Sequence, residues 1–157
     1  MLIHQAGRHH ASVANHSTWR TFMGCWGIGS FENDTAADWV CDLTAAGDLS
    51  LVREAVAAVL AADSAVDATD ATTALAAIEV IVAALGRPTA QALDEPDVVE
   101  WIARVKPLPD ARLASDAAQA IDRILGPTSE LRELWEDTDA FDDWQADVRG
   151  LRSRLQA

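Results

Sequence analysis

The sequence predicts an all-α, single-domain bundle of six or seven helices without a sheet. Half of the 157 residues are hydrophobic, and a chain of this length forms one domain that buries about two-thirds of its unfolded surface. The alanine-rich chain has no tyrosine and only five prolines, which favours helix over strand. Apolar residues recur at spacings of three and four, and no segment alternates apolar and polar residues between hairpin turns.

Two helices are expected after a short glycine-containing segment. Asn33 or Asp34 can cap the first helix, which is expected over residues 35–46. Asp48 can cap the second, in which apolar residues repeat at three and four over residues 51–60 with charges on the opposite face. The first helix is expected to end near Gly47, and the second is predicted to be an ordinary amphipathic helix.

The third helix, over residues 74–85, is predicted to be the central one. Its twelve residues include one charge, Glu79, and a helix that is apolar nearly all round is buried on most sides. Gly86 and Pro88 follow in the order that ends a helix.

Four helices are expected in the second half of the chain. Asp94 can cap the fourth before Pro107 ends it, and the fifth covers residues 110–125. Thr128 or Ser129 starts a short sixth helix. The last helix has the clearest pattern, with apolar residues at three and four that form one stripe: Phe141, Trp144, Val148, Leu151 and Leu155.

The chain is strongly acidic, with a formal net charge of −13. All 25 acidic residues lie from Glu32 onward, where ten basic residues leave a net charge of −15. Such a field repels phosphate backbones, so nucleic-acid binding is not expected, whereas basic proteins or cations are attracted.

The protein is expected to be cytoplasmic. No apolar run approaches the roughly 18–20 residues that cross a membrane, and no export signal is recognised. Cys25 and Cys41 lack metal-ligand spacing and indicate reduced thiols.

Residues 1–22 differ from the rest of the chain and are predicted to form a poorly ordered leader before a helical domain over residues 23–157. They contain every histidine of the sequence, namely His4, His9, His10 and His16. A metal site of these imidazoles is the alternative, but nothing in the sequence fixes their geometry. Because the acids and the first helical cap follow Met23, we expect the functional chain to begin there.

No catalytic residue, metal site or cofactor is predicted. Gly27-Ile28-Gly29 follows no strand and lacks the third glycine and the lysine of a phosphate loop. The body has no histidine to act as general base or metal ligand. The acids from Glu136 to Asp143 lack the glycine and the bidentate glutamate of a calcium loop.

Glu79 is the most interesting single carboxylate. A buried glutamate has a raised pKa and can serve as an acid or base. Glu79 shares a strip of the helix with Thr72, Ala76 and Ala83, and such a strip is more often a partly exposed edge. We therefore expect partial exposure.

The segment from Trp26 to Trp39 allows two interpretations. In the first, Trp26 and Phe31 plug one end of the bundle, and the glycines permit backbone angles that other residues avoid. In the second, polar residues around the aromatics form a shallow pocket for a ligand or partner. The candidate binding residues are Trp26, Phe31, Glu32, Asn33, Asp34, Asp38, Trp39 and Glu79.

The pattern Met-Gly-x-Trp-Gly-x-Gly-x-Phe-x-Asn-Asp-x-Ala-x-Asp-Trp over residues 23–39 resembles the opening of the bacterial domain-of-unknown-function family 4259. The resemblance continues through Gly86-x-Pro88, Trp101, the Ser-Glu-Leu-x-Glu-Leu-Trp of residues 129–135 and the helix of Trp144. Members usually start at the methionine that matches Met23. The resemblance implies a fold and no activity.

A protein-binding module is the leading functional hypothesis, in its most specific form an immunity-like protein that masks a basic toxin or nuclease. The small size, the acidic body and the lack of a catalytic set motivate it. The alternative is a small-ligand binder or enzyme that uses Trp26, Asp34, Asp38 and Glu79.

Overall fold

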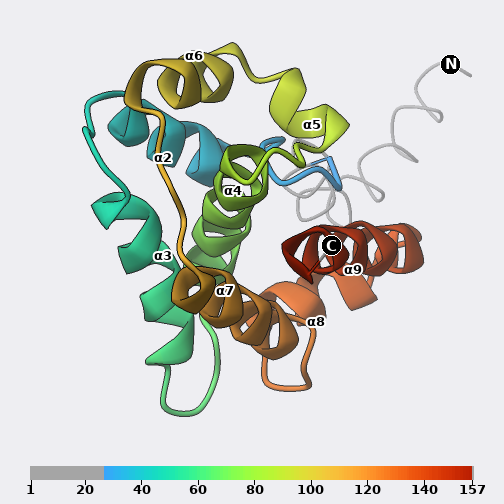
Figure 1. Cartoon of the computed structure of the whole chain (residues 1–157). Coiled ribbons are helices and arrows are strands. Elements are labelled where there is room, and N and C mark those ends of the chain that lie inside the picture. The colour runs from blue at the N-terminus through green and yellow to red at the C-terminus, as the bar shows by residue number, and fades with distance from the viewer. Residues whose placement is uncertain (1–26, 157) are drawn as a thin grey trace, which may run out of the picture.

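The fold consists of helices joined by short connections (Figure 1). The structure is a computed structural model and describes residues 27–156. Within these residues there are eight helices, one more than the upper end of the expectation, and no sheet. They are α2 (Asp34–Thr44), α3 (Ser50–Leu60), α4 (Ala68–Ala84), α5 (Ala90–Leu93), α6 (Pro96–Val105), α7 (Ala111–Ile124), α8 (Glu130–Glu136) and α9 (Phe141–Gln156). The expected leader, Met23, Cys25 and Trp26 lie outside the described residues.

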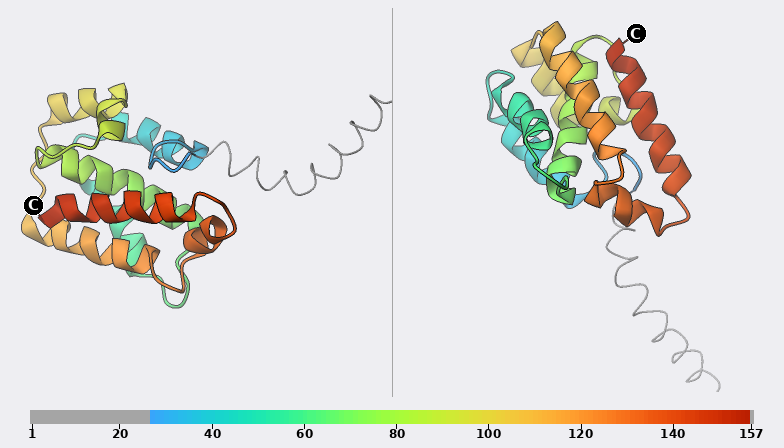
Figure 2. Two further views of the ribbon diagram at one scale, coloured as in Figure 1. Left: turned by 90° about the vertical axis from the view of Figure 1, so that its right-hand side faces the viewer. Right: turned by 90° about the horizontal axis from the view of Figure 1, so that it is seen from below.

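The helix α4 is the centre of the fold, as the sequence predicts. It contacts each of the other described helices, and the two views in Figure 2 show it surrounded by them. All residues from Ala74 to Val82 are buried, which matches a sequence that is apolar on every side. Gly86 ends the helix with a φ of +85°, a conformation that a side chain makes costly.

The helix α4 begins six residues before the expected start at Ala74. Asp67 caps it, because the Asp67 carboxylate accepts hydrogen bonds from the backbone N–H groups of Thr69 and Asp70. Threonine and aspartate have low helix propensity, which hides this first turn in the sequence. Burial of Ala71 and Thr72 in the bundle overrides that propensity.

The expected cap at Asp94 is wrong. Asp94 ends the short helix α5, and α6 starts at Pro96 with Glu95 as its N-cap residue. Proline favours this first position because it lacks an N–H that would be unpaired there. Helix α5 is one turn long, which is too short to show a helical periodicity in the sequence. It is therefore not predicted, and it accounts for the eighth described helix, one beyond the expected seven.

The loop between α3 and α4 and the loop between α7 and α8 are joined by backbone hydrogen bonds. Val66 N–H donates to Thr128 O at 2.9 Å, and Glu130 N–H donates to Val66 O at 3.0 Å. Ser129, which lies between these bonds, is fully buried and caps α8. The start of α4 is thereby held against the start of α8.

Arginines from one element repeatedly bind the C-terminal carbonyls of another. These carbonyls lack helical partners, and the helix dipole gives them negative charge. Arg104 donates to Thr44 O of α2 at 2.8 Å, and Arg123 donates to Val59 O of α3 at 2.8 Å. Further bonds of this kind join Arg132 to Leu125 O and Arg87 to Arg154 O. Arg154 in turn donates to Arg87 O and Pro88 O, which belong to the loop after α4.

The helices α8 and α9 meet through stacked aromatic rings. The ring centroids of Trp135 and Trp144 are 6.2 Å apart with planes 12° from parallel, and Phe141 stacks on Trp144 at the same separation. Trp144 is only 2% exposed, in the middle of the stripe that the sequence predicts for α9. None of the described helices has the length and apolar composition that a membrane span requires.

Replacing Trp144 by alanine should lower the free energy of unfolding by about 3–5 kcal/mol, because it leaves a cavity and removes both stacking contacts. Denaturant unfolding of the full chain measures this loss. Gln145→Ala on the same helix is the control and should change stability by less than about 0.5 kcal/mol. A loss below about 1 kcal/mol for Trp144→Ala would contradict the packing of α9 described here.

Candidate functional site

The residues that connect the start of the described chain to α2 form the candidate site. We call residues 27–33 the glycine segment. A turn closes within it, since Glu32 N–H donates to Gly29 O and Gly29 N–H donates to the Glu32 carboxylate. The segment ends at Asn33, whose side chain caps α2 by accepting from Ala36 N–H at 2.7 Å. This geometry confirms Asn33, rather than Asp34, as the cap.

Glu79 of α4 lies beneath the glycine segment and is only 1% exposed. The expectation that Glu79 stands at a partly exposed edge is therefore wrong. Its two carboxylate oxygens accept hydrogen bonds from Ser30 Oγ at 2.8 Å and from Thr89 Oγ1 at 2.6 Å. The small residues beside Glu79, such as Ala76, leave room for the glycine segment to lie close to α4, and this approach buries the carboxylate.

Gln91 of α5 extends the network from Glu79 to α9. The Gln91 carbonyl oxygen accepts from Ser30 N–H at 2.6 Å, and its amide nitrogen donates to Asp147 at 2.9 Å. Thr89, which donates to Glu79, also caps α5 by accepting from Ala92 N–H. One continuous set of hydrogen bonds thus joins the glycine segment, α4, α5 and α9.

Two carboxyls of this network have raised pKa values. Burial raises the pKa of Glu79 above its ordinary 4.5, and the hydrogen bonds from Thr89 and Ser30 partly oppose the rise. Burial also raises the pKa of Asp147, and the negative charge of Glu32 adds to it while the bond from Gln91 opposes it. The site therefore holds protons more tightly than free carboxylates do.

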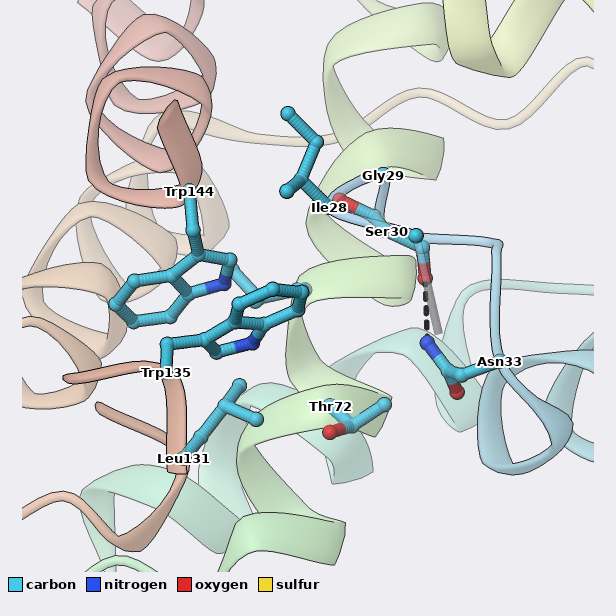
Figure 3. Close-up of a pocket in the computed structure, with 10 residues that line it drawn as sticks. Ile28, Gly29, Ser30, Asn33, Thr72, Leu131, Trp135 and Trp144 are labelled. Atoms are coloured by element: carbon cyan, nitrogen blue, oxygen red, sulfur yellow. Dashed lines mark hydrogen bonds between the residues drawn. The ribbon is translucent and has the colours of Figure 1, made fainter. Parts of the chain in front are cut away.

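A small cavity of about 20 Å³ lies between the glycine segment and the stacked tryptophans (Figure 3). This volume is enough for one water molecule. The rings of Trp135 and Trp144 line one side of the cavity, and Thr72 of α4 also lines it. The hydroxyl of Thr72 is buried and has no hydrogen-bond partner in the described part of the chain.

The structure separates the predicted site residues into three groups. Glu32, Asn33 and Glu79 belong to the network or its turn. Phe31 and Trp39 pack against the core, and Trp39 is 6% exposed on the inner face of α2. Asp34 and Asp38 are exposed on α2, and Trp26 lies outside the described residues.

Sequence analysis missed the residues that complete the site. Ser30 lies inside the opening pattern, and its short polar side chain among glycines is the only local signal. Thr89, Gln91 and Asp147 carry no signal, because their roles depend on contacts between distant parts of the chain. Thr72 shares the helix strip of Glu79, but that strip is predicted to be partly exposed. Within residues 27–156 no group of three or more histidines, cysteines and acids is placed to hold a metal ion.

The fold and the site define an all-helical protein built around one central helix with a single buried carboxylate. The chain belongs to the family described as Domain of unknown function (DUF4259), whose family model matches residues 24–147. Comparison with curated proteins found no match, and comparison with solved structures found none either. Three of the parts that carry the family resemblance, namely the glycine segment and the helices of Trp135 and Trp144, meet at the cavity.

Gly29→Ala should destabilise the protein more than Gly27→Ala. A Cβ on Gly29 would collide with the Glu32 carboxylate and lie 2.8 Å from the Gln91 carbonyl oxygen. Gln91 cannot move away without losing its bonds to Ser30 and Asp147, so we expect a loss of about 1–2 kcal/mol. A Cβ on Gly27 would displace the Glu32 carboxylate alone and break its bond from Gly29 N–H, so the loss there should stay below about 1 kcal/mol.

Thermal or denaturant unfolding of both alanine variants provides the measurement. Equal stabilities of the two variants would show that Gln91 does not hold the glycine segment in the way described.

Glu79→Gln should change how stability depends on pH. A carboxyl whose pKa is raised by folding contributes stability that is fully present below its unfolded pKa and is lost as pH rises through the folded pKa. The free energy of unfolding of Glu79→Gln minus that of the unchanged protein should therefore increase from about pH 4.5 upward. Denaturant unfolding between about pH 4 and pH 8 measures this difference, and a flat difference would contradict the raised pKa.

Proposed function

We propose that this protein is a binding module for a basic protein partner and that the exposed face of α2 contacts that partner. The observation that carries the proposal is an acidic stripe, which we define as Asp34, Asp38 and Asp42. These residues are spaced four apart, so they lie on one side of α2, and all three are exposed.

The charges of the acidic stripe are only partly compensated in the described part of the chain, since the helix dipole favours Asp34 in the first turn of α2 but not the acids beyond it. Like charges four residues apart destabilise a helix, and a negative charge in the last turn opposes the helix dipole. Within residues 27–156 no arginine or lysine forms an ion pair with Asp34, Asp38 or Asp42. A cationic partner would remove this repulsion on binding.

The rest of the charge distribution supports a basic partner. Most of the arginines bind helix ends or nearby acids and so are held by the protein itself. The ten basic and 25 acidic residues beyond residue 22 leave a net charge of −15. A field of this sign accelerates the encounter with a cationic protein and depends on ionic strength.

The specific form of the proposal is an immunity-like protein that masks a basic toxin or nuclease in the cytoplasm. A compact acidic domain can cover a basic active surface without any chemistry of its own. Cys41 is exposed as a free thiol on the same helix, which is compatible with a reducing compartment.

A small-ligand site around the glycine segment is the weaker alternative. The cavity there has room for one water molecule, whereas ligand sites usually enclose roughly 300–1,000 Å³. Asp34 and Asp38 lie on the exposed face of α2 and not among the residues that line the cavity.

The experiment is a pull-down from lysate of the native host with the full chain as bait. We expect a basic protein to be retained, and its retention to fall as the salt concentration rises from about 50 mM to about 500 mM. The triple variant Asp34→Asn, Asp38→Asn and Asp42→Asn should lose this partner while its melting temperature shows that it remains folded.

The matched control removes the same number of charges elsewhere, by Asp137→Asn, Asp142→Asn and Asp143→Asn near the start of α9. It should retain the partner. Equal loss from both variants would show a general charge effect without a site on α2, and retention that is indifferent to salt would overturn the electrostatic proposal.

A further inference from the structure

The glycine segment is attached to the body of the protein through ionisable groups. Its Ser30 donates to Glu79, its Ser30 backbone N–H is bonded to Gln91, and Gln91 in turn donates to Asp147. Within the segment itself, Glu32 accepts from Gly29 N–H. Three carboxyls on three different elements thus share one small network.

We propose that the glycine segment is a pH-responsive lid over the cavity beside Trp135 and Trp144, closed when the buried carboxyls beneath it carry protons and loosened when they ionise. This inference is independent of the proposed partner surface on α2. It assigns to Glu79 and Asp147 the role of controlling the lid through their protonation, which neither the fold nor partner binding requires.

The charges around Glu79 determine the direction of the response. From α9, Asp147 faces it as a second acid and Arg154 as the one cation that acts on it. From the glycine segment, Glu32 acts on Asp147. The helix α4 supplies no other charge near Glu79, because residues 71–86 contain no further ionisable side chain, and α5 supplies only the neutral Thr89 and Gln91. Ionisation of Glu79 and Asp147 therefore adds two negative charges beneath the segment, and Arg154 is the cation that acts on Glu79.

Opening the lid would return Glu79 to water, where its ionised form is well solvated. The closed state disfavours the ionised form because the carboxyl is 1% exposed. Protons therefore bind the closed state more tightly than the open state, and by linkage a rise in pH shifts the equilibrium towards opening. Each pKa unit between the two states corresponds to about a tenfold change in the opening equilibrium.

The surface beneath the lid is suited to a water molecule, for which the cavity has room. The Thr72 hydroxyl is 3% exposed and has no partner among the described residues. The indole N–H groups of Trp135 and Trp144 likewise form no hydrogen bond with another described residue, although Trp101 donates its own to Ala46 O at 2.8 Å. In Figure 3 the two tryptophan rings lie together on one side, across from Ser30 and Asn33, and Thr72 lies below them.

Hydrogen–deuterium exchange of the full chain tests the lid, read in peptides that cover residues 27–36. Each exchange rate is divided by the intrinsic rate at the same pH. In the unchanged protein, protection of these peptides should fall between about pH 5 and pH 8, by about tenfold for each pKa unit that separates the closed and open states. Protection of peptides from residues 148–156 of α9 should stay constant, which distinguishes lid opening from global unfolding.

Glu79→Gln keeps the shape of the side chain and removes its charge, so its protection over residues 27–36 should be high and independent of pH. Glu54→Gln, the same change at an exposed position of α3, is the matched control and should follow the unchanged protein. Asp147→Asn keeps an acceptor for Gln91 and should reduce the pH response, which provides a second test if Glu79→Gln does not fold.

Three results would overturn the proposal. Protection of residues 27–36 that is equal at pH 5 and pH 8 in the unchanged protein would show that ionisation does not move the lid. A pH response that Glu79→Gln and Asp147→Asn both retain would assign it to other groups. Parallel loss of protection in α9 would show global unfolding in place of a lid.

Discussion

The packing of every other described helix against α4 is the constraint on which the structure depends. A helix of seventeen residues that is buried along most of its length leaves no solvent-facing side on which a charge could be placed without cost. Glu79 occurs in its middle and is therefore either neutralised or bonded. The glycine segment and α5 meet this requirement, since Ser30 and Thr89 provide the two hydroxyl donors. The position of these two elements thus follows from the polarity of one residue on the central helix.

Several of the charged groups at the surface are also placed by the ends of the helices. Arginines bind the helix ends, where unpaired carbonyls and the helix dipole attract them. The reciprocal pair Arg87 and Arg154 joins the loop after α4 to the end of α9, where Arg87 binds a terminal carbonyl of the helix. Because cations are used in this way inside the fold, the acids dominate the field in solvent. The excess of acids in the sequence is therefore also an excess on the surface of the described part of the chain.

Much of the fold follows from the sequence because helical spacing and capping residues are local signals. The stripe of α9 and the caps Asn33 and Ser129 are examples, since each depends on neighbours within a few residues. For both caps the sequence leaves one adjacent residue, Asp34 or Thr128, as an alternative. The site depends on contacts across the chain, and these are not encoded locally. A helical wheel places Glu79 beside Ala76, but it cannot show that residues about fifty positions earlier cover that side. For the same reason Gln91 and Asp147, which are 56 residues apart, could not be recognised as partners.

One residue, Asn33, connects the buried network to the acidic stripe of α2. Asn33 ends the glycine segment, where its amide nitrogen lies 3.5 Å from Ser30 O, and its carbonyl oxygen caps α2 at Ala36 N–H. Asp34, the first acid of the stripe, follows it directly in the chain. A displacement of the glycine segment therefore acts on the cap of the helix that carries the stripe. Two sites are thermodynamically coupled only if each prefers a different state of a shared element, and Asn33 is the shared element through which protonation of Glu79 and binding at α2 would meet.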